Sequence, residues 1–337
     1  MHCLAQRSLS LPMTCTTRRA LLALPLLCAA GPLLAQPANA YPSKSVRIIV
    51  PYPPGAINDV LARLVAERLQ AGLGQSVVVE NRAGGGAVIG TQAVAAAAPD
   101  GYTLLQVSAV HANNASLVAK LPYDPLRNFA FITLAFRSPV LLVVNSAVPA
   151  RTLPELLALA RSKPGSLSYG STGNGGAAHL IGEMLKQRTG IEVLHVPYKG
   201  AAPAMTDLMG GRIDFTFATY TAAAAALKSG RARALASTGA QRLAIMPQLP
   251  TIAESGVKDF DAVGWWGFAA PAGTPPAVLA RLHQEINKAL QAPALRSAMH
   301  NEGVEVLGTS PEEFSRFVRA EIETWGEVIR RGNVRVE

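Results

Sequence analysis

Two glycine-bearing loops, each placed before a helix, are the stretches of this sequence best suited to chemistry. Residues 53–59 lie between a β-branched strand and apolar residues at helical spacing, and residues 171–176 have similar surroundings. We expect Asn58 to cap the first helix and Asp59 to stand in its first turn. The first amides of a helix have no partner within it, so such an end binds carboxylates or phosphates without a charged side chain. A plain α/β sheet would also contain such loops.

A serine hydrolase is a second interpretation of the later loop. Ser171 would be the nucleophile, with His179, His195 and Asp214 as partners. However, residues 170–173 read Gly-Ser-Thr-Gly and lack the Gly-x-Ser-x-Gly elbow. His179 is more typical of a residue packed on a helix face, and Asp214 of a cap at the start of a strand. We therefore rank this interpretation below ligand binding.

Cofactor and metal chemistry have weaker support. Gly173-x-Gly175 is similar to part of a dinucleotide loop, with Glu192 at the distance of a ribose-binding acid, but the glycine spacing is imperfect. No Gly-Lys-Ser/Thr follows a glycine-rich loop, which argues against a P-loop. The histidines lack the HExxH or paired spacing of a zinc site. We expect no cofactor and no metal.

The composition is that of a globular protein with two domains. The chain has 337 residues, of which 49% are hydrophobic and 16% charged, enough to bury a sizeable core. The net charge of +9 falls to +6 once Arg7, Arg18 and Arg19 of the leader are removed, because 28 basic residues then face 22 acids. This excess is spread along the sequence, so we expect no nucleic-acid partner.

The first 40 residues have the features of a secretory signal peptide. Arg18 and Arg19 precede an apolar run at residues 20–35, and Ala38-Asn39-Ala40 supplies a small-x-small cleavage pattern. Tyr41 is the expected first mature residue, and both general and twin-arginine export remain open. Because Cys3, Cys15 and Cys28 all precede this site, we expect no disulfide and no cysteine metal site in the mature protein.

Strands and helices alternate along the mature chain. We predict strands at residues 46–50, 75–80, 102–107, 129–144, 167–170, 192–196, 213–217, 232–237 and 260–270. We predict helices at residues 60–69, 89–98, 153–161, 177–187, 204–209, 222–227, 276–289, 293–301 and 311–330. This order requires mainly parallel strands with right-handed crossovers, which bring the loops to the carboxyl edge of each sheet. The result is two α/β lobes whose helix ends face a cleft.

A set of motifs across nearly the whole mature chain resembles the solute-binding proteins of tripartite tricarboxylate transporters, also called the Bug type. The motifs lie at residues 50–55, 78–84, 99–105, 121–125, 169–173, 179–180, 195–200, 249–256 and 270–275. The resemblance implies a type II periplasmic binding fold with two lobes joined by two crossing strands. Lobe 1 would comprise residues 41–141 and 265–337, and lobe 2 residues 142–264. Closure would bend the chain near Pro139 and Trp265.

The resemblance also implies which residues contact a carboxylate, mainly through backbone amides, hydroxyl groups and water. Carried over by position, they are Tyr52, Pro54, Gly55, Ala56, Ser108, His111, Ser171, Thr172, Gly173, Gly175, His179, Tyr198 and Thr219. The sequence departs from the family pattern at several positions, among which Ala56 stands where glycine is usual and Asn58 replaces a hydroxyl residue; residues 86–88 and 222–226 also differ.

We therefore expect a periplasmic protein without enzymatic activity that captures a small carboxylate. The ligand could be a dicarboxylate, a tricarboxylate, an amino acid or an aromatic acid. Its expected partners are the membrane permease subunits of a tripartite tricarboxylate transporter, and the protein itself is expected to be a monomer. The alternative is a periplasmic sensor that reports the same ligand to a membrane signalling protein and transports nothing.

Overall fold

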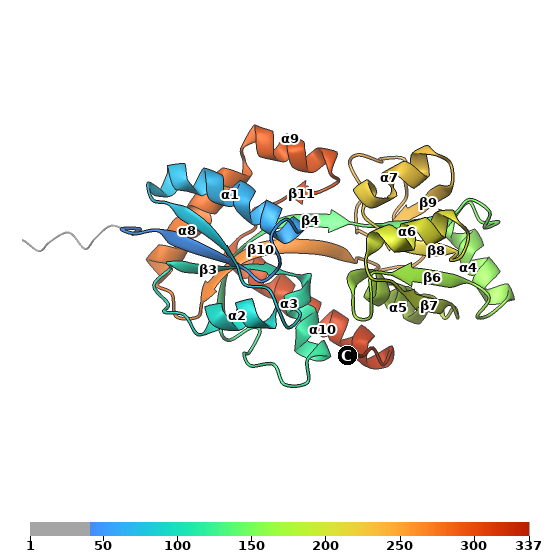
Figure 1. Ribbon diagram of the computed structural model, residues 1–337, viewed down its shortest axis with the longest axis horizontal. Helices are drawn as coiled ribbons and strands as arrows, with labels where there is room; N and C mark the ends of the chain where they lie inside the picture. The colour runs from blue at the N-terminus through green and yellow to red at the C-terminus, as the bar shows by residue number, and fades with distance from the viewer. Residues whose placement is uncertain (1–40, 337) are drawn as a thin grey trace, which may run out of the picture. The chain divides into compact units, whose positions relative to one another are not determined.

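The computed structural model describes residues 41–336, so the predicted signal peptide and the three cysteines lie outside the described residues. Within that range the chain forms a mixed α/β structure with two sheets (Figure 1). No helix in this part of the chain is long and apolar enough to span a membrane.

The first sheet has six strands in the order β11-β4-β10-β3-β1-β2. Their bounds are β1 Val46–Val50, β2 Val77–Asn81, β3 Thr103–Ser108, β4 Phe129–Pro139, β10 Val263–Pro271 and β11 Glu305–Val306. Strand β1 pairs in parallel with β2 and β3, as the alternating pattern predicted. Strand β10 runs antiparallel between β3 and β4.

The second sheet has five strands in the order β7-β6-β8-β5-β9. Their bounds are β5 Leu141–Asn145, β6 Ser168–Ser171, β7 Leu194–Pro197, β8 Phe215–Ala218 and β9 Ala232–Ser237. Strand β6 is parallel to β7 and β8, whereas β5 is antiparallel to both of its neighbours. Asp214 accepts hydrogen bonds from the backbone N–H and hydroxyl group of Ser168, which fits its predicted place at a strand start.

Ten helices cover the sheets in the described part of the chain. Their bounds are α1 Ile57–Leu73, α2 Val88–Ala95, α3 Ala109–Leu117, α4 Leu153–Ser162, α5 Ala177–Thr189, α6 Ala201–Met209, α7 Tyr220–Lys228, α8 Pro276–Leu290, α9 Pro293–Asn301 and α10 Pro311–Arg331. Helix α3 is the one that the sequence pattern did not predict. It carries Asn113 and Asn114 in a short polar stretch with no clear apolar period.

Helix α10 joins the two halves of the structure. Its early residues Phe314 and Val318 pack in the apolar cluster of the six-stranded sheet, whereas its later residues Val328 and Ile329 pack beneath the five-stranded sheet. Between them, Glu321 accepts hydrogen bonds from the indole N–H groups of Trp265 (2.7 Å) and Trp325 (3.0 Å). Burial raises the pKa of Glu321 to about 6.

The prediction that Asn58 caps α1 is wrong. The N-cap residue is Ala56, with an extended backbone (φ −67°, ψ 158°) and no side-chain cap. Asn58 is buried in the first turn, where its amide lies 3.4 Å from the Gln106 side-chain oxygen. The helix begins earlier than the apolar period indicated because Asp59 supplies an acceptor to the preceding loop, as described below.

Candidate ligand-binding site

The β1–α1 loop is held by a buried carboxylate. Asp59 Oδ2 accepts the backbone N–H of Gly55 at 2.9 Å and the Arg63 Nε–H at 3.0 Å. Its other oxygen accepts the side-chain amide of Asn81 at 2.9 Å. The Arg63 hydrogen bond, together with the Gly55 and Asn81 bonds, lowers the pKa of Asp59 to about 2. The first turn of α1 therefore contains an ionised carboxylate that is paired with the Arg63 guanidinium, whose Nη2 lies 2.9 Å from Asp59 Oδ1.

Two hydroxyl groups predicted to contact ligand lie together beside this loop. The hydroxyl group of Tyr52, after β1, is 2.7 Å from that of Ser108, at the end of β3. Burial raises the pKa of Tyr52 to about 12, so its phenol is neutral. Pro54 and Gly55 are exposed and Ala56 is half-buried. The carboxyl ends of two neighbouring parallel strands thus place these residues at one edge.

The β6–α5 loop is held without a charged group. Gly173 donates its N–H to the Ser171 hydroxyl at 3.1 Å, and Gly175 donates to His179 Nδ1 at 3.0 Å. The Ser171 hydroxyl lies 2.6 Å from His195 Nε2. The two imidazole rings stack with centroids 3.8 Å apart and planes 8° from parallel. Ser171, Gly173, Gly175 and His179 therefore form the internal frame of this loop.

Both imidazoles are neutral in this arrangement. Burial lowers the pKa of His179. Burial also lowers the pKa of His195 to about 4, and the neighbouring His179 adds to this effect. Hydrogen bonds to two neutral rings therefore order this loop without adding charge to it.

The contact between Ser171 and His195 is not arranged as a catalytic triad. Ser171 is 1% exposed, so its hydroxyl cannot meet a substrate. Asp214, the predicted acid, is bonded to Ser168. Among the described contacts of His195, no carboxylate orients the ring for proton transfer. This geometry speaks against the hydrolase interpretation.

A pocket of about 160 Å³ opens at the edge of the five-stranded sheet, in front of three helix N-termini. It is lined by Val140, Thr172, Ala177, Ala178, Ile181, Ala201, Ala204, Met205, Thr216, Phe217, Ala218, Thr219 and Ala222. These residues include the first turns of α5, α6 and α7. None of the lining side chains is charged, and none of the three first turns contains an acid.

This pocket unites Thr172 and Thr219, two of the predicted contacts. Thr219 also caps α7, because its hydroxyl accepts the N–H of Ala222 at 3.3 Å. The alanines of the pocket were missed by the sequence interpretation, since an alanine methyl carries no polar signal. Only their position at predicted helix starts could have indicated them.

Two other predicted contacts have structural partners instead. His111 is buried, and its Nε2 lies 2.8 Å from the Pro125 carbonyl oxygen, while its ring packs on Tyr123 and Phe129. Burial lowers the pKa of His111 to about 4, so the ring is neutral. The Tyr198 hydroxyl donates to Asp207 at 2.9 Å. We leave both residues out of the proposed contacts.

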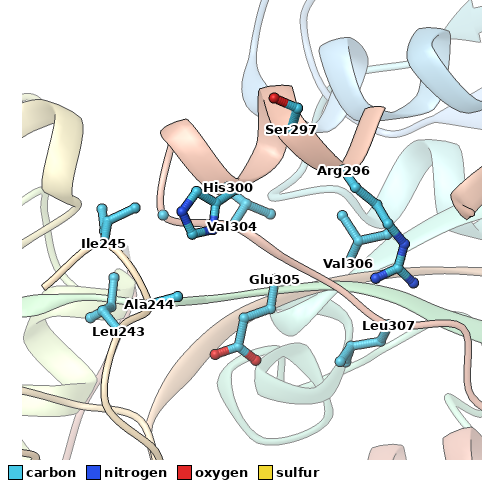
Figure 2. A pocket seen from close by; sticks show the side chains of 11 residues that line it. Leu243, Ala244, Ile245, Arg296, Ser297, His300, Val304, Glu305, Val306 and Leu307 are labelled. Atoms are coloured by element: carbon cyan, nitrogen blue, oxygen red, sulfur yellow. The ribbon is translucent and has the colours of Figure 1, made fainter. Parts of the chain in front are cut away.

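A larger hollow of about 510 Å³ lies elsewhere, between residues 243–245 and the segment from α9 to Leu307. Figure 2 shows His300 on the side of Ile245, with Arg296 and Glu305 around the same space. It contains none of the residues predicted from the sequence. Its lining includes acidic, basic and apolar side chains, whereas the smaller pocket has no charged side chain. The described residues contain no cluster able to hold a metal ion.

The sequence matches the family described as "Tripartite tricarboxylate transporter family receptor" over residues 61–334. The chain belongs to this family. Protein BugT of Bordetella pertussis is 37% identical over 302 residues, which cover 89% of this chain and 93% of BugT. The family resemblance inferred from the motifs is thus confirmed.

Solved structures agree with this assignment. "R. palustris Rpa4515 with adipate" is 35% identical, has a TM-score of 0.72, and matches over 88% of this chain and 99% of that one. "MatC (Rpa3494) from Rhodopseudomonas palustris with bound malate" is 29% identical, has a TM-score of 0.69, and matches over 86% of this chain and 100% of that one. The predicted periplasmic binding fold with two α/β sheets is confirmed.

Proposed function

We propose that this family member is a periplasmic solute-binding protein that captures a small carboxylate for a tripartite tricarboxylate-type transporter. The observation that carries the proposal is the uncharged pocket at the N-termini of α5, α6 and α7. Their first-turn amides and aligned peptide dipoles favour an anion, while no side chain of the pocket competes for it. Relatives with bound adipate and malate support the same ligand class.

We further propose that residues 41–141 and 265–337 form one lobe and residues 142–264 the other. The transitions between the two sheets support these limits: β4 ends at Pro139 and β5 begins at Leu141, and β10 begins at Val263. Bending there would bring Tyr52, Gly55 and Ala56 over the ligand. The exported chain would begin at Tyr41.

The pocket allows an estimate of the size of the bound group and of the affinity. Its volume of about 160 Å³ is close to the ~150 Å³ of an engineered protein cavity that holds benzene, so the pocket has room for about six carbon atoms of a ligand. Each charge-assisted hydrogen bond to the carboxylate contributes about 1.5–3 kcal/mol. Three or four of them therefore account for micromolar affinity, which needs about 8 kcal/mol.

The test is calorimetry and thermal shift of the exported chain with adipate, malate, citrate, glutamate and benzoate. We expect at least one of them to bind with micromolar affinity and to raise Tm. The variant Ala201→Glu places a carboxylate in the pocket from an exposed position at the start of α6 and should weaken binding at least tenfold.

Ala202→Glu is the matched control, because it is exposed in the same helical turn but does not line the pocket. We expect it to change affinity less than threefold. Failure of all five ligands to bind would overturn the proposed function. Equal effects of the two variants would show that the ligand lies elsewhere.

A further inference from the structure

The two glycine-bearing loops enter their helices with the same construction. Gly55 donates its N–H to Asp59 four residues later, and Gly175 donates to His179, also four residues later. Both glycines have positive φ, 80° and 71°, and the residue after each has an extended backbone without a side-chain cap. The accepting side chain therefore sits in the third helical position in both cases, as the acid of a capping box does.

The two acceptors differ in charge. Asp59 is an anion with a low pKa, and it meets the partial positive charge at the start of α1. His179 accepts through a neutral ring nitrogen, so the start of α5 keeps its partial positive charge. The uncharged pocket lies at α5. One loop is thus ordered by a carboxylate that is paired with Arg63 and occupies the helix end, and the other is ordered by a neutral ring.

We propose that His179 is a positioning residue: it orders the β6–α5 loop through a neutral acceptor and so keeps the start of α5 available to the ligand carboxylate. The proposal rests on the proposed function and deepens it by assigning the carboxylate to the half of the cleft built on the five-stranded sheet. His179 itself touches the Gly175 amide and the ring of His195.

The surroundings of His179 explain why an imidazole serves here. His195 stacks on it from β7 and bonds to Ser171, which in turn accepts the Gly173 amide, so one pair of rings holds two loop amides. Protonation of His179 Nδ1 would direct an N–H at the Gly175 N–H. Two cationic rings 3.8 Å apart would also repel each other.

Some charged and titratable neighbours of His179 favour its protonation, and others oppose it. Glu183 Oε1 lies 4.0 Å from His179 Nε2 and favours a cation. The same carboxylate is already bonded to Lys186 at 2.8 Å and accepts the Tyr169 hydroxyl at 3.1 Å. Lys186 and His195 both disfavour a cation at His179, as does burial. The neutral ring therefore persists at neutral pH.

Three substitutions separate position from charge. In His179→Asn, the amide oxygen takes the place of Nδ1 and should keep affinity within threefold of wild type. His179→Asp keeps an acceptor but adds the charge found at Asp59, and it should weaken binding at least 30-fold. His179→Leu removes the acceptor and should weaken binding at least tenfold. Calorimetry uses the tightest binder among adipate, malate, citrate, glutamate and benzoate.

Two readouts distinguish positioning from general stability. The ratio of wild-type to His179→Asn affinity should fall once the pH is lowered below the reduced pKa of His179, because only the wild type loses its acceptor; titration of the ligand cancels in this ratio. Hydrogen exchange at the Gly175 amide, measured without ligand, should quicken at least tenfold in His179→Leu and stay unchanged in His179→Asn.

The proposal is overturned if His179→Asp binds as tightly as His179→Asn, or if His179→Leu leaves both affinity and Gly175 exchange unchanged. If none of the five carboxylates binds, the proposed function fails, whereas the exchange measurement still decides whether His179 orders the loop.

Discussion

The β1–α1 and β6–α5 loops each place a glycine amide on a side chain of the first helical turn, but that side chain is a carboxylate paired with Arg63 in the first loop and a neutral imidazole in the second. The position of the accepting side chain therefore determines the shape of the loop, whereas the type of that side chain determines the charge at the helix end. A carboxylate at the third helical position orders the loop and occupies the helix end that could otherwise bind an anion. An imidazole at that position gives the same loop shape and leaves the anion site open. The two halves of such a protein can therefore contribute unequally to the affinity for the ligand.

The largest difference between the two loops should appear when their glycines are replaced. A Cβ at Gly175 would come within 2.5 Å of Val336 Cγ1 and 3.3 Å of Leu117 Cδ1, whereas nothing lies within 4 Å of one at Gly55. Gly175→Val combines this clash with an unfavourable positive φ and should weaken ligand binding at least 100-fold. Gly55→Val carries only the backbone cost, about 1–2 kcal/mol, and should weaken binding less than tenfold.

Calorimetry measures both variants, with Gly165→Val as the control for backbone strain. Gly165 has a φ of 71° and open space around it, in the loop between α4 and β6. If Gly55→Val weakened binding more than Gly175→Val, the assignment of the ligand to the second loop would be wrong.

Asp59 should matter for stability more than for binding. Its side chain is 5% exposed, and Asp59→Ala leaves the Gly55 amide without its side-chain acceptor and removes one of the acceptors of the Asn81 amide and of Arg63. We expect the free energy of unfolding to fall by about 2 kcal/mol in urea titrations at pH 7. Glu67→Ala, an exposed carboxylate on the same helix, should change it by less than about 0.5 kcal/mol.

The same residue predicts a pH dependence. The pKa of Asp59 in the folded protein, about 2, lies below its ordinary value of 3.8, so the folded state binds this proton less readily than the unfolded chain. Its contribution is complete above about pH 4 and is lost as the pH falls toward 2. Unfolding curves of wild type and Asp59→Asn should therefore converge in this range; a constant difference between them would contradict the assigned role.

The smallest effect is expected at the hydroxyl pair beside the first loop. Tyr52→Phe leaves the buried Ser108 hydroxyl without its 2.7 Å partner, which should cost about 1 kcal/mol of stability. Because the carboxylate is assigned to the other half of the cleft, affinity should fall less than fivefold. A loss above 50-fold would mean that Tyr52 holds the charged group. The carboxylate would then belong to the first loop and not to the second.

Much of the fold could be predicted from local patterns. The parallel pairing of β1 with β2 and β3 agrees with the prediction from β-branched runs that alternate with amphipathic segments. The antiparallel insertion of β10 between β3 and β4 could not be derived in this way, since it pairs residues separated by more than 120 positions. The family resemblance implied two crossing strands between the lobes, but not this pairing.

The candidate site was harder to predict, because sequence shows which groups are polar but not which are already bonded. Ser171, Gly175 and His179 have the chemistry of ligand contacts, yet Gly175 is bonded to His179, and Ser171 is bonded to Gly173 and to His195, which lies 24 residues beyond it. His111 looked equally suitable and is enclosed by aromatic rings. Conversely, the alanines of the pocket offer backbone amides, which any residue type possesses.

The shared acceptor at Glu321 has a practical consequence. Trp265 and Trp325 donate to one carboxylate, and Trp266, the remaining tryptophan of the three in the chain, follows directly in β10. Every indole of the protein thus lies where β10 and α10 connect the two sheets. Indole emission responds to hydrogen bonding and nearby charge, so selectively excited tryptophan fluorescence reports on this junction. Ligand-driven movement could be followed in the unlabelled protein, in real time, with no residue replaced.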